Sequence, residues 1–157
     1  MYIYGIDPGY TGAIAILDTH ASTLKIFDMP VAKNTKGKTD LNMPALAEIL
    51  LPWTHAPSMA VIEKVHAMPG QGVSSVFRFG ECFGAIRMAV AGHRIPERYV
   101  SPAHWKKHFG LNRDKGVSRN LATQRFPNMA HMFKRVKDDG RAEAALLALY
   151  GQEKLMI

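Results

Sequence analysis

Short apolar segments separated by turn residues dominate the first thirty positions of the chain. They predict β-strands over residues 2–7, 13–18 and 24–29, because each is rich in β-branched, aromatic or aliphatic side chains and is bounded by turn-forming residues. The first connection is Pro8-Gly9-Tyr10-Thr11-Gly12, which has the composition of a tight turn. Connections this short favour an antiparallel three-stranded meander.

Further along the chain, helical and strand patterns alternate. Apolar residues at helical spacing predict a short helix over residues 44–51, and a buried strand follows over residues 59–63. Because a helix intervenes, this strand is expected to pair in parallel with the first one. Residues 31–40 are polar and are expected to form an exposed loop. The remaining predicted elements are a long helix from Ser74 or Ser75 to residue 91, a strand over 98–100, and helices over 102–108, 117–126 and 141–150, the last of them ended by Gly151. This order predicts a single α/β domain over residues 1–157 with a mixed sheet.

The composition is that of a globular protein. Of 157 residues, 47% are hydrophobic and 21% are charged, and no apolar run reaches the ~18 residues that a membrane-spanning helix needs. The N-terminus lacks the basic segment of a secretory signal, and the one cysteine, Cys82, excludes a disulfide framework and is expected in the core. We therefore expect a cytoplasmic protein, in a bacterium or in the host cell if a phage encodes it, without a membrane partner.

The distribution of charge is more informative than the composition. The formal net charge is +7, and the segment 94–137 contains eleven basic residues against two acids, Glu97 and Asp114. A basic region on a slightly acidic body is typical of proteins that bind polyanions, nucleic acid above all.

Acidic residues stand at the ends of several predicted elements. Asp7 ends the first strand and Glu63 ends the fourth, so parallel pairing of these strands would bring both carboxylates to one edge of the sheet. Asp139 and Glu143 are four residues apart at the start of the last helix and share one face, with Asp138 as an alternative to Asp139. Any one of these acids could merely cap an element, but together they suit Mg²⁺ or Mn²⁺ bound next to phosphate oxygens.

The basic segment also contains aromatic residues. Trp105, Phe109 and Phe126 are interleaved with lysines and arginines, so they could stack on bases or anchor two short amphipathic helices. We favour anchoring for the aromatics and phosphate contact for the cations.

Two other motifs are weak. Gly37-Lys38-Thr39 resembles the end of a phosphate-binding loop, but the earlier glycine is replaced by Ala32 and no helix follows directly. His104 and His108 have the helical spacing of metal ligands, but no third ligand accompanies them.

Taken together, these features resemble a RuvC-type Holliday junction resolvase of the RNase H-like superfamily, in particular its small phage-type members. The resemblance covers most of the chain and rests on the order and spacing of short motifs. They are Gly5-Ile6-Asp7-Pro8-Gly9, Thr11-Gly12-Ala13, Val61-Ile62-Glu63, Gly70-Gln71-Gly72, Phe79-Gly80, Phe83-Gly84, Val100-Ser101-Pro102, Trp105-Lys106-Lys107, Asp114-Lys115, Ser118-Arg119 and Asp139-Gly140-Arg141-Ala142-Glu143-Ala144.

This resemblance implies a fold and an activity. The expected fold is a five-stranded mixed sheet of order 3-2-1-4-5 flanked by helices. The expected activity is metal-dependent endonuclease cleavage of two symmetric strands at a four-way DNA junction by a homodimer, with two Mg²⁺ or Mn²⁺ ions in each active site. The resemblance assigns metal binding and catalysis to Asp7, Glu63, Asp139 and Glu143.

Three further groups of residues receive a role. Lys106 and Lys115 match basic residues near the scissile phosphate, and Lys107 and Arg119 are expected to bind DNA beside them. His66 stands where some members place an aromatic residue at the junction centre. The long helix is the candidate dimer interface, because it is apolar beyond one buried face; the expected contacts are Phe79, Gly80, Phe83 and Gly84.

Other functions remain open at this point. A flap, fork or RNase H-type nuclease would use the same acids, and a non-catalytic nucleic-acid-binding domain could share the fold. Sugar kinases and actin-like ATPases also begin with a Gly-Ile-Asp-x-Gly turn, but they need two such domains, which 157 residues do not supply. We therefore expect no nucleotide cofactor.

Overall fold

The structure of the protein is a computed structural model that describes residues 1–51, 56–112 and 114–155, without the side chain of Lys115. Its centre is a five-stranded sheet of order β3-β2-β1-β6-β7. The strands are β1 (Tyr2–Asp7), β2 (Ala13–Asp18), β3 (Thr23–Asp28), β6 (Ser58–Glu63) and β7 (Glu97–Val100). β1 to β3 form an antiparallel meander, whereas β6 pairs in parallel with both β1 and β7. The mixed sheet predicted from the sequence is confirmed, and its strand order corresponds to 3-2-1-4-5.

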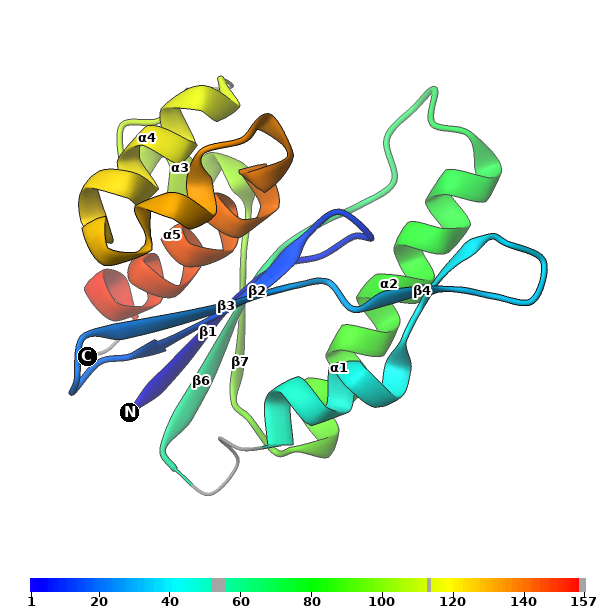
Figure 1. Ribbon diagram of the computed structural model, residues 1–157, viewed down its shortest axis with the longest axis horizontal. Coiled ribbons are helices and arrows are strands. Elements are labelled where there is room, and N and C mark those ends of the chain that lie inside the picture. Colours follow the sequence, from blue (N-terminus) through cyan, green and yellow to red (C-terminus); the bar gives the residue numbers. More distant parts are fainter. Residues whose placement is uncertain (52–55, 113, 156–157) are drawn as a thin grey trace.

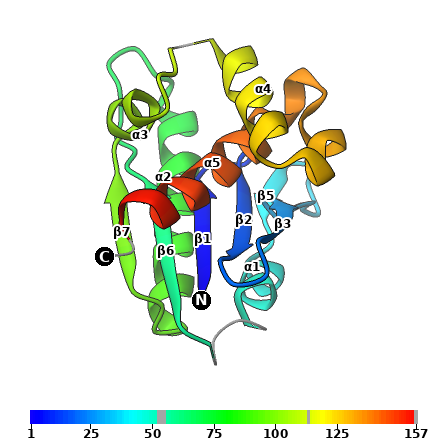
Figure 2. The same cartoon turned by 90° about the vertical axis from the view of Figure 1, so that its left-hand side faces the viewer.

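Helices cover both faces of this sheet (Figures 1 and 2). α1 (Met43–Leu50) and α2 (Val73–Gly92) lie on one face. The other face carries α3 (Pro102–His108), α4 (Lys115–Arg125) and α5 (Asp139–Lys154), together with two short 3-10 helices, η2 (Pro127–Phe133) and η3 (Val136–Asp138).

The alternation of side chains along the strands produces two cores. On β1, Tyr4 and Ile6 join the core beneath α1 and α2, whereas Ile3 joins the core beneath α5. Trp105 of α3 is fully buried in this second core, and Cys82 of α2 is fully buried in the first. Phe109 and Phe126 pack against the core below α5, which confirms that the aromatics of the basic segment anchor their helices.

The contact of α5 with β1 depends on a glycine. A Cβ atom on Gly5 would lie 2.1 Å from the backbone oxygen of Ala144 and 2.3 Å from the backbone nitrogen of Ala148. The absence of a side chain therefore lets α5 cross β1 backbone against backbone. This close approach sets the position of the acidic first turn of α5 relative to the end of β1.

The largest departure from the predicted elements is a hairpin. Residues 31–40, expected to be a loop, form β4 (Val31–Lys33) and β5 (Thr39–Leu41), which pair with each other in a separate two-stranded sheet. The strands are only three residues long, β4 is exposed throughout, and β5 is half-buried only at Thr39 and Leu41. They are therefore too short to show the alternating apolar pattern on which strand prediction relies.

Smaller departures concern helix ends. α2 begins at Val73 with Gly72 as its N-cap and without a side-chain cap, so neither Ser74 nor Ser75 starts it. α5 runs from Asp139 to Lys154 and continues through Gly151, because that glycine packs against Val61 and Ile3 in the core. Among the described residues, no helix is long and apolar enough to cross a membrane.

Candidate active site

Acidic residues at the ends of three strands lie along one edge of the sheet. The register pairs Asp7 of β1 with Ala13 of β2, and Ala13 with Asp28 of β3. On the other side, Ile6 pairs with Ile62 of β6, so Asp7 and Glu63 end neighbouring parallel strands at the same level. Alternation from Gly5, which meets α5, places Asp7 on the face that α5 covers.

The first turn of α5 lies at the same edge. A Cβ atom on Gly140 would lie 2.6 Å from the backbone oxygen of Thr11 and 2.9 Å from the Cα atom of Gly12, so α5 begins against the turn between β1 and β2. The helix therefore brings Asp139 and Glu143, one turn apart, to the edge where β1 ends. The same contact leaves no room for a side chain at position 140.

Glu63 is held by an aromatic residue whose role the sequence did not reveal. The indole Nε1–H of Trp105 donates a hydrogen bond of 2.8 Å to Oε1 of Glu63, in a buried environment. Val100 of β7 pairs with Glu63, and α3 follows directly behind Ser101, whose side chain caps the helix. The indole thus fixes one oxygen of the carboxylate.

Two basic residues neutralise two of the acids. Nζ of Lys106 lies 2.9 Å from Oε1 of Glu143, and these side chains are only 21% and 6% exposed. Arg119 of α4 forms an ion pair with Asp139, again with both side chains mostly buried. Both cations were expected to bind DNA, and in this structure their charges face the candidate carboxylates.

The donor set suits a hard divalent cation, because it consists of carboxylate oxygens at one edge of a sheet. Its present arrangement does not form a complete metal site: among residues 1–51, 56–112 and 114–155, no three His, Cys, Asp or Glu side chains form a group that could hold a metal ion. Since Lys106 and Arg119 engage Glu143 and Asp139, a cation that binds there must compete with them.

Asp138 has a different environment from Asp139. Its side chain is 1% exposed and accepts hydrogen bonds from the backbone and the guanidinium of Arg135, with Arg141 at 3.3 Å on the same oxygen. The guanidinium of Arg135 holds the pKa of Asp138 below its usual range. Asp138 therefore joins η3 to α5, and it is already saturated by cations.

We expect Asp138→Asn to destabilise the protein by about 2 kcal/mol at neutral pH, because it removes the charged partner of Arg135 and Arg141. A depressed carboxyl pKa contributes stability above the unfolded pKa and loses it as the pH falls through the folded one. The difference between wild type and variant in urea unfolding should thus be constant near pH 7 and shrink below about pH 4. Unchanged stability combined with lost cleavage would instead make Asp138 the site residue.

The other candidate DNA contacts lie on the surface near this edge. Lys107 is exposed on α3, and His66 is exposed in the loop that follows Glu63. Lys115 is the first residue of α4, and its side chain lies outside the described part of the structure. His108, four residues after His104, pairs with Glu153 at 2.7 Å.

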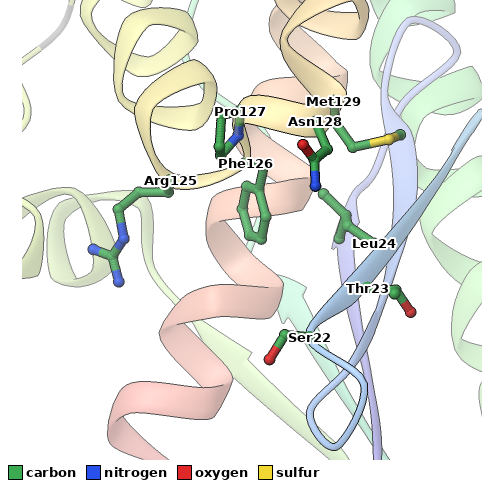
Figure 3. Close-up of a pocket in the computed structure, with 8 residues that line it drawn as sticks. All are labelled: Ser22, Thr23, Leu24, Arg125, Phe126, Pro127, Asn128 and Met129. Atoms are coloured by element: carbon green, nitrogen blue, oxygen red, sulfur yellow. The ribbon is translucent and has the colours of Figure 1, made fainter.

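A cavity remote from the acids lies between the β2–β3 turn and the start of η2 (Figure 3). Its volume is about 210 Å³, and Leu24, Phe126 and Met129 form its apolar wall. Arg125, at its rim, is already paired with Glu153. The residues that line the cavity include no acid, so the cavity is separate from the candidate site.

Comparison with known proteins places this fold. RuvC of T. thermophilus in complex with a Holliday junction substrate matches with a TM-score of 0.59 and 12% identity, over 98% of this chain and 96% of that one. Another structure of Thermus thermophilus RuvC matches with a TM-score of 0.58 and 13% identity, over 98% and 96% of the two chains. The Holliday junction resolvase of fowlpox virus matches with a TM-score of 0.57 and 18% identity, over 99% and 100%. No protein-family model and no curated protein matches the sequence. The chain therefore has an RNase H-like fold similar to those of RuvC and a poxvirus resolvase.

Proposed function

We propose that this protein is a metal-dependent endonuclease that resolves four-way DNA junctions by cutting two symmetrically placed strands. The observation that carries this proposal is the meeting of Asp7, Glu63 and the first turn of α5 at one edge of an RNase H-like sheet, beside the basic helices α3 and α4. The similarity in fold to a RuvC bound to a Holliday junction, over nearly the whole chain, supports the choice of substrate.

The proposed roles follow from the contacts. Asp7, Glu63, Glu143 and Asp139 would bind Mg²⁺ or Mn²⁺, which when bound neutralises charge on a phosphate group and activates water for hydrolysis. Trp105 keeps one oxygen of Glu63 in place through its 2.8 Å hydrogen bond.

Lys106 has two proposed positions. In the structure it compensates the charge of Glu143 at 2.9 Å. If Glu143 served as a metal ligand, the Lys106 ammonium group would be free to contact the phosphate backbone, because it lies on a long flexible stem at the same edge. In the same way, Arg119 would exchange its ion pair with Asp139 for a contact with the phosphate backbone.

We also propose that a second copy of the chain packs on α2, since symmetric cuts call for two sites related by a twofold axis. α2 exposes a stripe at helical spacing that contains Phe77, Gly80, Gly84 and Met88, with Phe77 73% and Met88 69% exposed. The other two predicted contacts, Phe79 and Phe83, are half-buried: the Phe79 ring lies beside Gly9 and Phe83 packs against the core. The proposed interface is therefore this stripe.

Gly84→Leu should convert the dimer to a monomer and abolish paired cuts. A Cβ atom on Gly84 would meet nothing within 4 Å beyond the neighbouring backbone of its own helix, and position 84 is exposed. The variant should therefore fold normally, and only a second copy would be displaced. Sedimentation velocity measures the change, with Ala47→Leu on the exposed surface of α1 as the matched control. A wild type that sediments as a monomer even on junction DNA would contradict the dimer.

A panel of matched DNA substrates tests the proposed function. Four-way junction, flap, fork and RNA–DNA hybrid substrates of shared sequence should be incubated with the wild type in Mg²⁺, in Mn²⁺ and in EDTA. We expect cleavage of the four-way junction above all others, with either metal and none in EDTA. If the flap, fork or hybrid were cleaved in preference, that nucleic acid would replace the four-way junction as the proposed substrate. Full activity in EDTA would refute the metal-dependent mechanism.

A further inference from the structure

The β4–β5 hairpin is a surface element that has no part in the proposed function so far. It forms its own two-stranded sheet, in which Val31 pairs with Leu41 and Lys33 with Thr39. Most of its residues are exposed, and three of the ten residues from 31 to 40 are lysines. A hairpin that buries so little apolar surface is not explained by core packing.

The tip of the hairpin is fixed by one asparagine. Oδ1 of Asn34 accepts hydrogen bonds from the backbone amides of Lys36 and Lys38, both at 2.9 Å, and its Nδ2 donates to Asp40 at 2.7 Å. Gly37 adopts φ of 71°, the left-handed region that favours glycine. The lysines are thus presented by an ordered turn, which lowers the entropic cost of holding a ligand.

The positive charge of this turn is not cancelled locally. Asp40, the acid of the hairpin, faces Arg78 of α2 at 3.8 Å, and Arg78 also donates a hydrogen bond to the backbone oxygen of Thr39. Among the residues that the structure describes, neither Lys36 nor Lys38 forms an ion pair with a carboxylate. Arg78 therefore both fastens the hairpin to α2 and offsets its acid.

The hairpin begins at the edge of the sheet that carries the acids. The chain leaves β3 at Asp28, which stands in one row with Ala13 and Asp7, and it enters β4 three residues later. The hairpin lies against α2, on the opposite side of the sheet from α3 and α4 (Figure 1). The candidate carboxylates consequently stand between two basic elements, one on each side of the sheet.

We propose that the β4–β5 hairpin is a second DNA-binding element, which contacts the phosphate backbone of a duplex arm on the α2 side of the cleavage site through Lys33, Lys36 and Lys38. This inference rests on the proposed function, because it assigns the hairpin to the same nucleic-acid substrate. Contacts of lysine with phosphates supply affinity and orientation without reading the sequence. The hairpin would therefore hold an arm while α3 and α4 lie beside the cut strand.

The test replaces the two tip lysines together. Lys36→Gln with Lys38→Gln should leave the hairpin folded, because Asn34 binds backbone amides there and not the lysine side chains. The matched control is Lys25→Gln with Lys154→Gln, which removes the same charge from an exposed position within β3 and from the last residue of α5. Binding of a four-way junction in EDTA is measured as a function of salt concentration, and cleavage in Mg²⁺ is measured at saturating protein.

We expect the slope of log Kd against log salt to fall by about 2 in the hairpin variant, about one for each lost phosphate contact, and to change little in the control. Cleavage at saturation should stay at the wild-type rate. A hairpin variant with the slope of the wild type, or with the same slope as the control, would overturn the inference. If the wild type cuts no branched DNA, the proposed function fails, whereas the slopes measured in EDTA still decide whether the hairpin binds DNA.

Discussion

Replacing Asp7 with asparagine should reduce cleavage of a four-way junction by at least about 10³-fold, equivalent to about 4 kcal/mol of transition-state stabilisation, while leaving junction binding intact. Asp7 ends the central strand, between β2 and β6 and on the face of α5, so it is the acid nearest the middle of the acidic edge. The substitution removes a ligand charge, but it changes none of the basic side chains of α3 and α4. Single-turnover cleavage and gel-shift binding, measured on the same junction, separate the two effects.

The matched control for Asp7 is Asp18→Asn. The same substitution is made here at the end of β2 that lies away from Asp7. Asp18 pairs with Tyr2 there and accepts a 2.9 Å hydrogen bond from the backbone of His20. We expect wild-type cleavage from this control. Residual cleavage by Asp7→Asn near the wild-type rate would show that the acidic edge is not the catalytic centre.

Gly5→Ala should destabilise the protein by about 3 kcal/mol and abolish cleavage as well. The new methyl group would overlap the backbone of Ala144 and Ala148, at 2.1 and 2.3 Å, and backbone atoms cannot rotate away. α5 would have to move off β1, and it would carry Asp139 and Glu143 away from Asp7. Urea unfolding gives the stability, and cleavage at a temperature where the variant is folded gives the activity.

Gly92→Ala is the control for this substitution. Gly92 is the last residue of α2, and a Cβ atom there meets nothing within 4 Å. The change should be neutral or should stabilise the helix by up to about 1 kcal/mol. If Gly5→Ala unfolds at the same urea concentration as the wild type, the close crossing of α5 over β1 is wrong.

The sheet and the grouping of the acids could be predicted because both depend on local patterns. Short apolar strands bounded by turn residues define β1, β2, β3 and β6, and an intervening helix favours parallel pairing. Once β1 and β6 are neighbours, Asp7 and Glu63 must lie side by side.

The partners of the acids could not be predicted in this way. Trp105 and Glu63, which share a hydrogen bond, are 42 residues apart in the sequence, and Lys106 and Glu143 are 37 apart. Neither contact can therefore be recognised from a local sequence pattern. Trp105 has an apolar ring with one polar N–H, and a buried indole generally needs an acceptor. That requirement was the one signal that could have pointed to a carboxylate.

The hairpin and the start of α5 escaped prediction for different physical reasons. β4 and β5 are stabilised by Asn34 and Arg78 and not by an apolar face, which removes the periodic signal. Which of Asp138 and Asp139 faces the edge depends on the contact of Gly140 with Thr11, a tertiary constraint. The structure resolves their surroundings: Asp138 is surrounded by arginines and Asp139 starts the helix beside Arg119.

The most direct test of the central claim is the product formed from a supercoiled plasmid that extrudes a cruciform, a four-way junction within a closed circle. Paired symmetric cuts across the junction linearise the plasmid in one encounter, whereas single cuts leave a nicked circle. We expect linear plasmid as the first product with wild type in Mg²⁺, and no linear product with Asp7→Asn. Nicked circles that accumulate before any linear DNA, or an intact plasmid, would contradict the assignment of this protein as a junction-resolving endonuclease.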